Sequence, residues 1–424
     1  MDENETLNHA PLIHVKNKHG LIVRSASLAR RGLESLQTLH RVVRFPSDVS
    51  IGDVYLFDPS SDISSWFIYL TKYQWDGPFT DFEVEEIKGV CGEISVHSGK
   101  NLILVVNADD KSAFSRLEEL DPQALDGLLI TGSIAYGECE SFKHLSRLRF
   151  LSLSRDGVTD AEMQYLADLG SLFYLDLKSS DLTDKGLSLL SSLTELRYLY
   201  LSGTKISDNG LSQVEKFPMI EYLNLDFTGI TNVGLSNLIG ATSLTQLSLW
   251  NTDITDEGLS HLSDLPNLEA LDLSSLKITD SGLAYLVNLK SLSRLNLCVT
   301  RITDVGLSYL NNLPALSDLN LSGTNCTDEG LRYLAKSNFD NLSNLDLCGT
   351  KVTPMGLRYL YPVKSLRHVN VNLHGFSSKD LDEFRLCRPD CKITWDGMYS
   401  ALGLFVPSYG RFDSSIEFKR KLWV

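Results

Sequence analysis

No stretch of this sequence approaches the roughly 18 consecutive apolar residues that a membrane-spanning helix requires. The first residues, Met-Asp-Glu-Asn-Glu-Thr, lack the basic and apolar regions of a secretory signal. Basic residues are few, with 39 Lys and Arg against 54 Asp and Glu, and a formal charge of −15 would repel a phosphate backbone. We therefore expect no membrane partner, no nucleic-acid partner and a cytoplasmic location.

The cysteines are too scattered for a disulfide framework. Seven occur in 424 residues, an odd number without regular spacing, which favours a reduced intracellular protein. Cys387 and Cys391 lie close in sequence, but zinc normally takes four ligands and no second Cys or His pair has suitable spacing. We interpret both as small structural thiols, and we interpret His368 and His374 as solvated histidines.

Catalytic motifs are also missing. The glycine-rich phosphate loop, the His-Glu-x-x-His metal helix and the Gly-x-Ser-x-Gly nucleophile turn do not occur. The sequence therefore predicts no enzyme, no cofactor and no metal site. An enzyme with an unrecognised activity in residues 1–98 is kept as an alternative.

What the sequence does contain is an internal repeat. The pattern L-x-x-L-x-L recurs every 24 residues, with one interval of 26. Its copies start at Leu148, Leu172, Leu196, Ile220, Leu244, Leu268, Leu292, Leu316, Leu342 and Leu366. A fixed period of this length is typical of a solenoid, in which each unit is too small to bury its own apolar face.

One unit, Leu292 to Pro314, predicts a short strand followed by a short helix. Leucines that alternate with polar residues indicate the strand, and leucines at three-residue spacing after Gly306 indicate the helix. An acid or amide precedes each helix, and we interpret these residues as helix N-caps: Asp160, Asp184, Asp208, Asn232, Asp256, Asp280, Asp304 and Asp328. Threonines after the strands are expected to link successive turns by hydrogen bonds: Thr204, Thr228, Thr252, Thr300, Thr324 and Thr350.

Stacked units would place a parallel sheet on the concave side and short helices on the convex side, an α/β architecture. The consensus L-x-x-L-x-L-x-x-T-x-I-T-D-x-G-L-x-x-L-x-x-L resembles the T-D-x-G-L class of leucine-rich repeats, found in bacterial repeat proteins and, with cysteine in the turn, in F-box repeat proteins. The resemblance covers Leu148 to about Trp395 and implies a right-handed leucine-rich-repeat solenoid that binds a protein.

The ends of the array predict four segments. Residues 1–98 do not follow the period and suggest a small β-rich domain or extended cap, with strands near His40–Phe45 and Asp53–Phe57. Residues 99–147 are interpreted as capping and irregular repeats, and residues 148–395 as ten repeats plus a final strand. Residues 396–424 are unusually apolar and are interpreted as a cap over the last repeat, or otherwise as a segment for self-association or partner binding.

The inner face of the predicted sheet can be read from the residues that flank the strand leucines, because alternate side chains point to opposite faces. Its N-terminal half is aromatic, and we expect a protein partner to bind there through Phe150, Tyr174, Tyr198, Tyr200, Tyr222, Phe227 and Trp250. Coverage of these rings by residues 1–98 or by the tail is the main alternative. We call these seven residues the aromatic patch.

The C-terminal half of the inner face is polar and acidic. Asp272, Asp318 and Asp346, with Arg294 as an exception, form a secondary surface that could steer a basic partner. An Asn and Asp row kept for solubility explains it equally well. The leading hypothesis is a protein-interaction scaffold with an unidentified partner. The resemblance to F-box repeat proteins gives an alternative, namely a substrate receptor or effector subunit of a ubiquitin-ligase-type complex. Residues 1–98 contain no recognisable F-box, which weakens this alternative.

Overall fold

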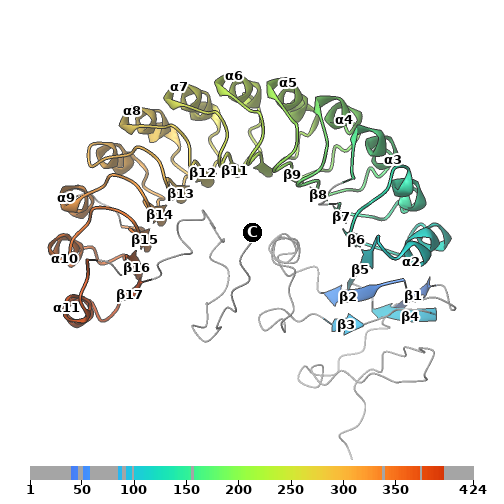
Figure 1. Ribbon diagram of the computed structural model, residues 1–424, viewed down its shortest axis with the longest axis horizontal. Coiled ribbons are helices and arrows are strands. Elements are labelled where there is room, and N and C mark those ends of the chain that lie inside the picture. The colour runs from blue at the N-terminus through green and yellow to red at the C-terminus, as the bar shows by residue number, and fades with distance from the viewer. Residues whose placement is uncertain are drawn as a thin grey trace, which may run out of the picture.

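The computed structural model describes residues 40–45, 51–57, 85–87, 92–97, 100–153, 157–336, 340–372 and 375–395. In these residues short strands and short helices alternate and form an arch, with the strands on its inner side and the helices on its outer side (Figure 1). The predicted solenoid of concave parallel sheet and convex helices is thus confirmed. The tail, residues 396–424, and His374 lie outside the described residues.

The strands of the repeats pair in parallel, each with the strands of the repeats before and after it. Every strand begins one residue before the second leucine of its repeat, so this leucine points into the core while its neighbours point to the inner side. These strands are β7 (Phe150–Ser152), β8 (Tyr174–Asp176), β9 (Tyr198–Tyr200), β10 (Tyr222–Asn224), β11 (Gln246–Ser248), β12 (Ala270–Asp272), β13 (Arg294–Asn296), β14 (Asp318–Asn320), β15 (Asn344–Asp346), β16 (His368–Val371) and β17 (Lys392–Trp395).

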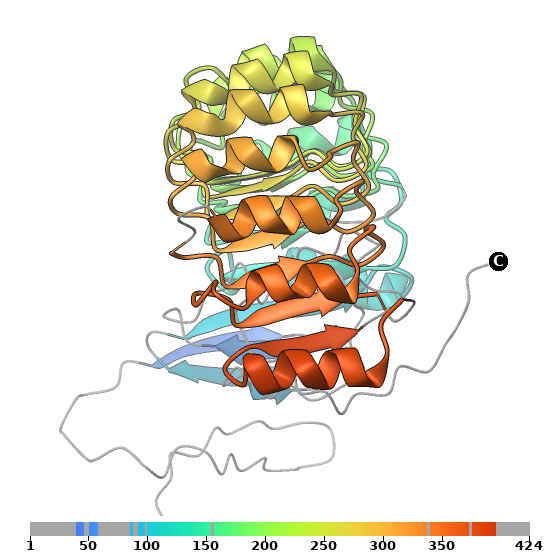
Figure 2. The same ribbon diagram turned by 90° about the vertical axis from the view of Figure 1, so that its left-hand side faces the viewer.

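The helices stack in a column along the outer side of the arch (Figure 2). In five of the ten described repeats, one turn of α-helix continues as a 3-10 helix. They are η3 (Asp160–Glu162), α3 (Met163–Leu166), α4 (Asp184–Leu189), α5 (Asp208–Leu211), η4 (Ser212–Lys216), α6 (Asn232–Leu235), η5 (Ser236–Leu238), α7 (Asp256–Leu259), η6 (Ser260–Asp264), α8 (Asp280–Leu283), η7 (Ala284–Asn288), η8 (Gly306–Asn312), α9 (Asp328–Lys336), α10 (Pro354–Leu357), η9 (Arg358–Leu360) and α11 (Ser378–Cys387). The interval of 26 residues contains α9, a helix of nine residues.

The repeat sheet continues into the N-terminal region without a break. β6 (Gly127–Thr131) and β5 (Asn101–Asn107) pair in parallel before the first repeat, with α2 (Lys111–Ser115), η1 (Arg116–Glu119) and η2 (Glu138–Phe142) on the outer side. β2 (Asp53–Phe57) then pairs antiparallel with β5, and β3 (Glu85–Ile87) pairs antiparallel with β2. β1 (His40–Phe45) and β4 (Gly92–His97) form a separate two-stranded sheet. The predicted strands at His40–Phe45 and Asp53–Phe57 are β1 and β2.

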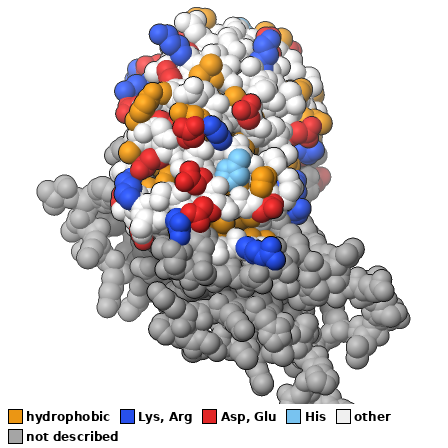
Figure 3. Space-filling model, turned by 90° about the vertical axis from the view of Figure 1, so that its right-hand side faces the viewer, with side chains coloured by type: hydrophobic (Ala, Val, Ile, Leu, Met, Phe, Trp, Pro, Cys, Tyr) orange, Lys and Arg blue, Asp and Glu red, His pale blue; other side chains and the backbone are white. Residues whose placement is uncertain are grey.

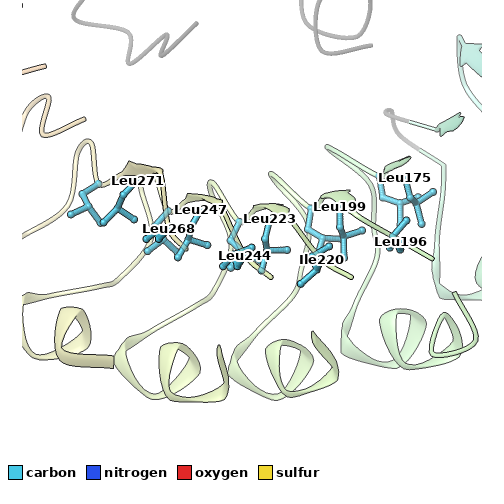
Figure 4. Packing of buried hydrophobic residues seen from close by; sticks show 14 of the residues in the cluster. Leu175, Leu196, Leu199, Ile220, Leu223, Leu244, Leu247, Leu268 and Leu271 are labelled. Atoms are coloured by element: carbon cyan, nitrogen blue, oxygen red, sulfur yellow. The ribbon is translucent and has the colours of Figure 1, made fainter. Parts of the chain in front are cut away.

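One continuous core fills the space between the strands and the helices. Equivalent leucines of successive repeats lie against one another in rows, as Leu196, Ile220, Leu244 and Leu268 do (Figure 4). All four have at most 1% of their surface exposed. Each repeat therefore depends on its neighbours for burial, and the array is stabilised along its length by contacts between adjacent repeats.

The acids before the helices are not N-caps, and that prediction was wrong by one residue. The preceding Thr or Ser occupies the cap position; Thr183, for example, accepts a hydrogen bond from the amide of Lys185 through its side chain. Asp184 is the first helical residue and turns toward the next repeat. There its carboxylate accepts hydrogen bonds from the amide of Ser207 at 2.8 Å and from the Ser207 hydroxyl at 2.5 Å.

The same link recurs along the array. It joins Asp160 to Thr183, Asp184 to Ser207, Asp208 to Thr231, Asn232 to Thr255, Asp256 to Thr279, Asp280 to Thr303, Asp304 to Thr327 and Asp328 to Thr353. We call it the Asp–Thr link. It explains the glycine of the consensus, because a Cβ on Gly210 would lie 2.3 Å from Oδ1 of Asp184. Threonine, aspartate and glycine of the consensus thus act together to join adjacent repeats.

The turn threonines also act differently from the prediction. Thr204 donates its hydroxyl proton to the carbonyl of Leu201 at 2.6 Å, three residues back in the same repeat. The other threonines of this position do the same, namely Thr228, Thr252, Thr300, Thr324 and Thr350. They close the turn within a repeat and do not bridge successive turns.

The C-terminal end of the array has a different closure. α11 begins with a capping box of Ser377 and Asp380, and β17 completes the sheet. Between them, the buried guanidinium of Arg388 donates hydrogen bonds to the carbonyls of Leu360, Val363 and Leu366 at 2.7 to 3.0 Å. Arg388 therefore gives a second donor to three backbone carbonyls of the last two repeats, which also accept from the amides of Val363 and Leu366 and from the guanidinium of Arg367.

Candidate partner-binding surface

The aromatic residues of the inner face lie in register across four adjacent strands. Tyr174 pairs with Phe150 and Tyr198, and Tyr198 pairs with Tyr222. The ring centroids of Tyr174 and Tyr198, and of Tyr198 and Tyr222, are each 6.3 Å apart. Tyr200 packs between them, at 4.6 Å from Tyr222. The repeat period thus brings together the first five residues of the aromatic patch.

These five rings are not equally accessible. Phe150, Tyr174 and Tyr200 are buried, with at most 3% of their surface exposed, whereas Tyr198 and Tyr222 are partly buried. The buried rings belong to a second apolar cluster on the inner face that includes Tyr55 of β2, Ile103 of β5 and Leu129 of β6. Three of the seven predicted contact residues therefore support the patch from below and are closed to a partner in this conformation.

Burial also shifts the acidity of these phenols. The pKa of Tyr200 and that of Tyr222 are raised, first because desolvation disfavours the phenolate and then because neighbouring groups, including Asp176 and Asp226, repel it. Both side chains are therefore neutral phenols at physiological pH.

Phe227 and Trp250 form the accessible part of the aromatic patch. Their rings meet edge to face with centroids 4.5 Å apart, a favourable arrangement for two aromatic side chains. The indole nitrogen of Trp250 donates a hydrogen bond to Oγ of Ser275 at 3.2 Å, which fixes the ring. Phe227 has 46% of its surface exposed. This pair can meet a partner without any rearrangement.

Sequence reasoning missed Phe173, which lies one position before Tyr174. The guanidinium groups of Arg149 and Arg197 each lie 5.4 Å from its ring, within the range of a cation–π interaction. Phe173 also lies 5.3 Å from Tyr198, and Arg197 forms an ion pair with Glu221. The sequence did contain a signal for this cluster, because the 24-residue period places four residues at equivalent positions of successive repeats: Arg149, Phe173, Arg197 and Glu221.

The acidic residues of the C-terminal half are held by hydrogen bonds across strands. Asp272 accepts from Ser274 and from the amide side chain of Asn296 at 2.9 Å. Asp318 accepts from Asn344 at 2.6 Å, and Asp346 accepts from Ser322, Cys348 and Asn370. Arg294 is partly buried and lies in register with Asp318. The row is thus a polar network that ties neighbouring repeats together.

The pKa of Asp272 is raised from 3.8 to about 6. Desolvation is the main cause, and hydrogen bonds from Ser274 oppose it.

The raised pKa predicts a pH dependence of stability. Asp272 holds its proton more tightly in the folded chain than in the unfolded chain. Its contribution to the free energy of unfolding should therefore fall as pH rises from about 4 to 6 and stay constant above pH 6. The difference in unfolding free energy between the wild type and Asp272→Asn, measured from pH 4 to 7, should decline over that window; a constant difference would contradict it.

The outer surface over the described N-terminal repeats carries a mixture of side-chain types. Figure 3 shows acidic and basic side chains interspersed there, with hydrophobic side chains standing singly.

Within the described ranges, no group of three or more His, Cys, Asp or Glu side chains could hold a metal ion. His368 bonds to Thr394 at 2.7 Å, and the six described cysteines are free thiols, with Cys391 buried and Cys387 exposed. None of the helices described is both long and apolar enough to span a membrane.

The family model for the leucine-rich repeat matches residues 171–191, 192–213, 240–263 and 264–287. These segments are leucine-rich repeats. The repeats outside the matched segments continue the same sheet in the same register. The match supports a protein-interaction module in general, since repeat solenoids present extended concave binding surfaces. The T-D-x-G-L class and the likeness to F-box repeat proteins stay predictions.

Several solved structures of leucine-rich-repeat proteins are similar to this chain. An internalin (inlF) of Listeria monocytogenes is 26% identical, with a TM-score of 0.46 over 61% of this chain and 76% of its own. An internalin C2 (inlC2) of the same bacterium is 27% identical, with a TM-score of 0.38 over 54% and 83%. A leucine-rich-repeat protein of Leptospira interrogans is 17% identical, with a TM-score of 0.45 over 69% and 89%. No curated protein matches the chain.

Proposed function

We propose that this protein binds another protein along the inner face of its sheet. The accessible contacts would be Phe227, Trp250, Tyr198 and Tyr222, and the buried rings of Phe150, Tyr174 and Tyr200 would support the two tyrosines. The observation that carries the proposal is the pair of the exposed Phe227 and the partly buried Trp250, because aromatic side chains dominate the energetics of protein interfaces and a ring fixed before binding loses little entropy.

The polar half of the inner face would guide the partner. Asp272, Asp318 and Asp346 give it an acidic character that is only partly offset by Arg294, so a basic partner would be favoured. Attraction of this kind raises the association rate more than the affinity and weakens with salt. The cytoplasmic location, the ubiquitin-ligase-type alternative and self-association through residues 396–424 stay predictions, because no described residue bears on them.

The test is a full-chain variant that combines Trp250→Ala with Tyr198→Ala. Each change should weaken binding by about 2 kcal/mol, roughly 30-fold, because each removes a large ring from the contact. Capture of partners from lysate, followed by mass spectrometry, should then lose the proteins that the wild type retains. The matched control is Tyr285→Ala, which removes an exposed tyrosine from η7 on the outer side.

Circular dichroism must show that the variant stays folded. Equal capture by the wild type and the folded variant would contradict the proposal. Loss of the same proteins with Tyr285→Ala would also contradict it, since the contact would then not be confined to the inner face.

A further inference from the structure

The residue two places after the third apolar residue of the repeat motif adopts a left-handed backbone conformation in every repeat where the structure describes it. Its φ angle lies between 54° and 69° in eight successive repeats, at Ser179, Gly203, Phe227, Asn251, Ser275, Val299, Gly323 and Gly349. The cause is the turn at the carboxyl end of the strand, where the amide of this residue donates to a carbonyl of the next repeat; Phe227 donates to Trp250 at 2.9 Å and Val299 to Ser322 at 2.8 Å. We call it the left-handed position.

Phe227 and Val299 are poor choices for the left-handed position. Glycine adopts this conformation without penalty and Asn or Ser tolerates it, whereas a bulky or β-branched residue lowers the folding equilibrium by an order of magnitude or so. Burial does not offset this strain, because Phe227 is 46% exposed and Val299 is 48% exposed. Phe227 gains a ring contact with Trp250, but about half of each side chain stays open to solvent, and strained residues of this kind are typical of functional sites.

We infer that Phe227 and Val299 are two anchors for an extended segment of the partner that carries an apolar side chain on each anchor and a Lys or Arg between them. The inference rests on the proposed function and deepens it by assigning the kind of partner. The segment would cross β10, β11, β12 and β13 at the carboxyl edge of the sheet, where Trp250 adjoins the Phe227 anchor.

The spacing of the anchors favours an extended segment over a helix. Phe227 and Val299 are three repeats apart, which at about 4.8 Å per strand is about 14 Å. Side chains at i and i+4 of an extended chain lie on one face and about 13 to 14 Å apart. A helix would need nine or ten residues for the same distance, and residues at that separation point away from each other.

The charge between the anchors favours a basic residue in the middle. β12 lies between β10 and β13 and carries Asp272, a residue with 9% of its surface exposed. No lysine or arginine of the described residues forms an ion pair with Asp272, and its polar partners are Ser274 and Asn296. A cation from the partner would complement this desolvated carboxylate better than any apolar or acidic group would.

The first arm of the test measures stability. Phe227→Gly and Val299→Gly, singly and together in the full chain, should each raise the folding equilibrium constant a few-fold, because relief of the strain exceeds the backbone freedom that glycine adds. Ser179→Gly is the matched control, since it changes the same position at φ 56° and removes only a small polar side chain. A loss of stability in the two anchor variants would overturn the inference, because their side chains would then serve the fold.

The second arm measures binding, with a displayed library of random 12-residue peptides as the probe. Peptides selected on the full chain should carry apolar residues at i and i+4 with Lys or Arg between them. Synthetic copies should bind the Phe227→Gly, Val299→Gly double variant at least tenfold more weakly than the wild type, and Ser179→Gly as tightly as the wild type. Their affinity should fall as salt rises.

The two proposals fail in different ways. Peptides that lose affinity for Trp250→Ala but not for the double glycine variant would overturn the anchors and leave the proposed function standing. Faster trypsin cleavage within residues 396–424 of the double glycine variant would show that the chain's own tail occupies the anchors. A dimer mass that this variant loses would assign them to a second copy. Either of these last two outcomes would overturn the inference.

Discussion

Gly210→Ala is expected to destabilise the protein by about 2 kcal/mol, although alanine is the better helix former by about 1 kcal/mol. The added Cβ would lie 2.3 Å from Oδ1 of Asp184 and 2.9 Å from Cγ2 of Ile206. The carboxylate of Asp184 would have to move away from the amide and hydroxyl of Ser207. Loss of these two bonds, one from a part-buried amide, outweighs the gain in helix propensity.

Denaturant unfolding of the single and double variants measures this effect. Asp184→Ala alone should also destabilise the chain, because the Ser207 amide loses its acceptor. Together the two changes should cost about 1 kcal/mol less than their sum, because the overlap disappears with the carboxylate. Gly170→Ala is the control, since a Cβ there meets no atom within 4 Å. If the losses of unfolding free energy in Asp184→Ala and Gly210→Ala simply added in the double variant, the steric role of the glycine would be refuted.

Arg388→Met is expected to cost about 3 kcal/mol and to act locally. The guanidinium of Arg388 is 1% exposed, and without it the carbonyls of Leu360, Val363 and Leu366 each lose one of their two donors, a charged one. Because a solenoid is stabilised by contacts between neighbouring repeats, the loss should concentrate at its C-terminal end.

Hydrogen exchange gives the spatial pattern of this loss. Amides of β16 and β17 should exchange faster in Arg388→Met, whereas those of β9 to β12 should keep their wild-type rates. Arg385→Met, three residues earlier on α11, removes an arginine whose side chain is 43% exposed and should change stability by less than about 0.5 kcal/mol. Uniform acceleration along the whole array would contradict a local role for Arg388.

The repeat period allowed the sheet, the helices and the register of the inner-face residues to be predicted. Tyr174, Tyr198 and Tyr222 lie side by side because equal spacing in sequence becomes equal position in a stack. The burial of Tyr174 could not be predicted in this way, because it depends on Tyr55 and Ile103, which belong to strands outside the period.

The Asp–Thr link was missed for a different reason. Threonine and aspartate are both good N-cap residues, so the sequence alone does not decide which of the two caps the helix. The partner of Asp184 is Ser207, 23 residues away in the next repeat, and only the stacking of the repeats brings them together. Local sequence rules describe one unit, whereas this link belongs to the boundary between two.

The Asp–Thr link also bears on how such a gene can change in length. The seven units that start at Leu172 to Leu316 each carry the acid that the following unit needs, with Asn232 in its place once, and the glycine that leaves room for the acid of the preceding unit. A duplication or deletion of 24 codons within this span would therefore leave a matched boundary without any compensating substitution. The span between Asp328 and Thr353 is two residues longer than the others and keeps the link, so small insertions are tolerated on the helical side of the unit. Selection could thus adjust the reach of the inner face by recombination of whole units, while the strands and their register stay intact.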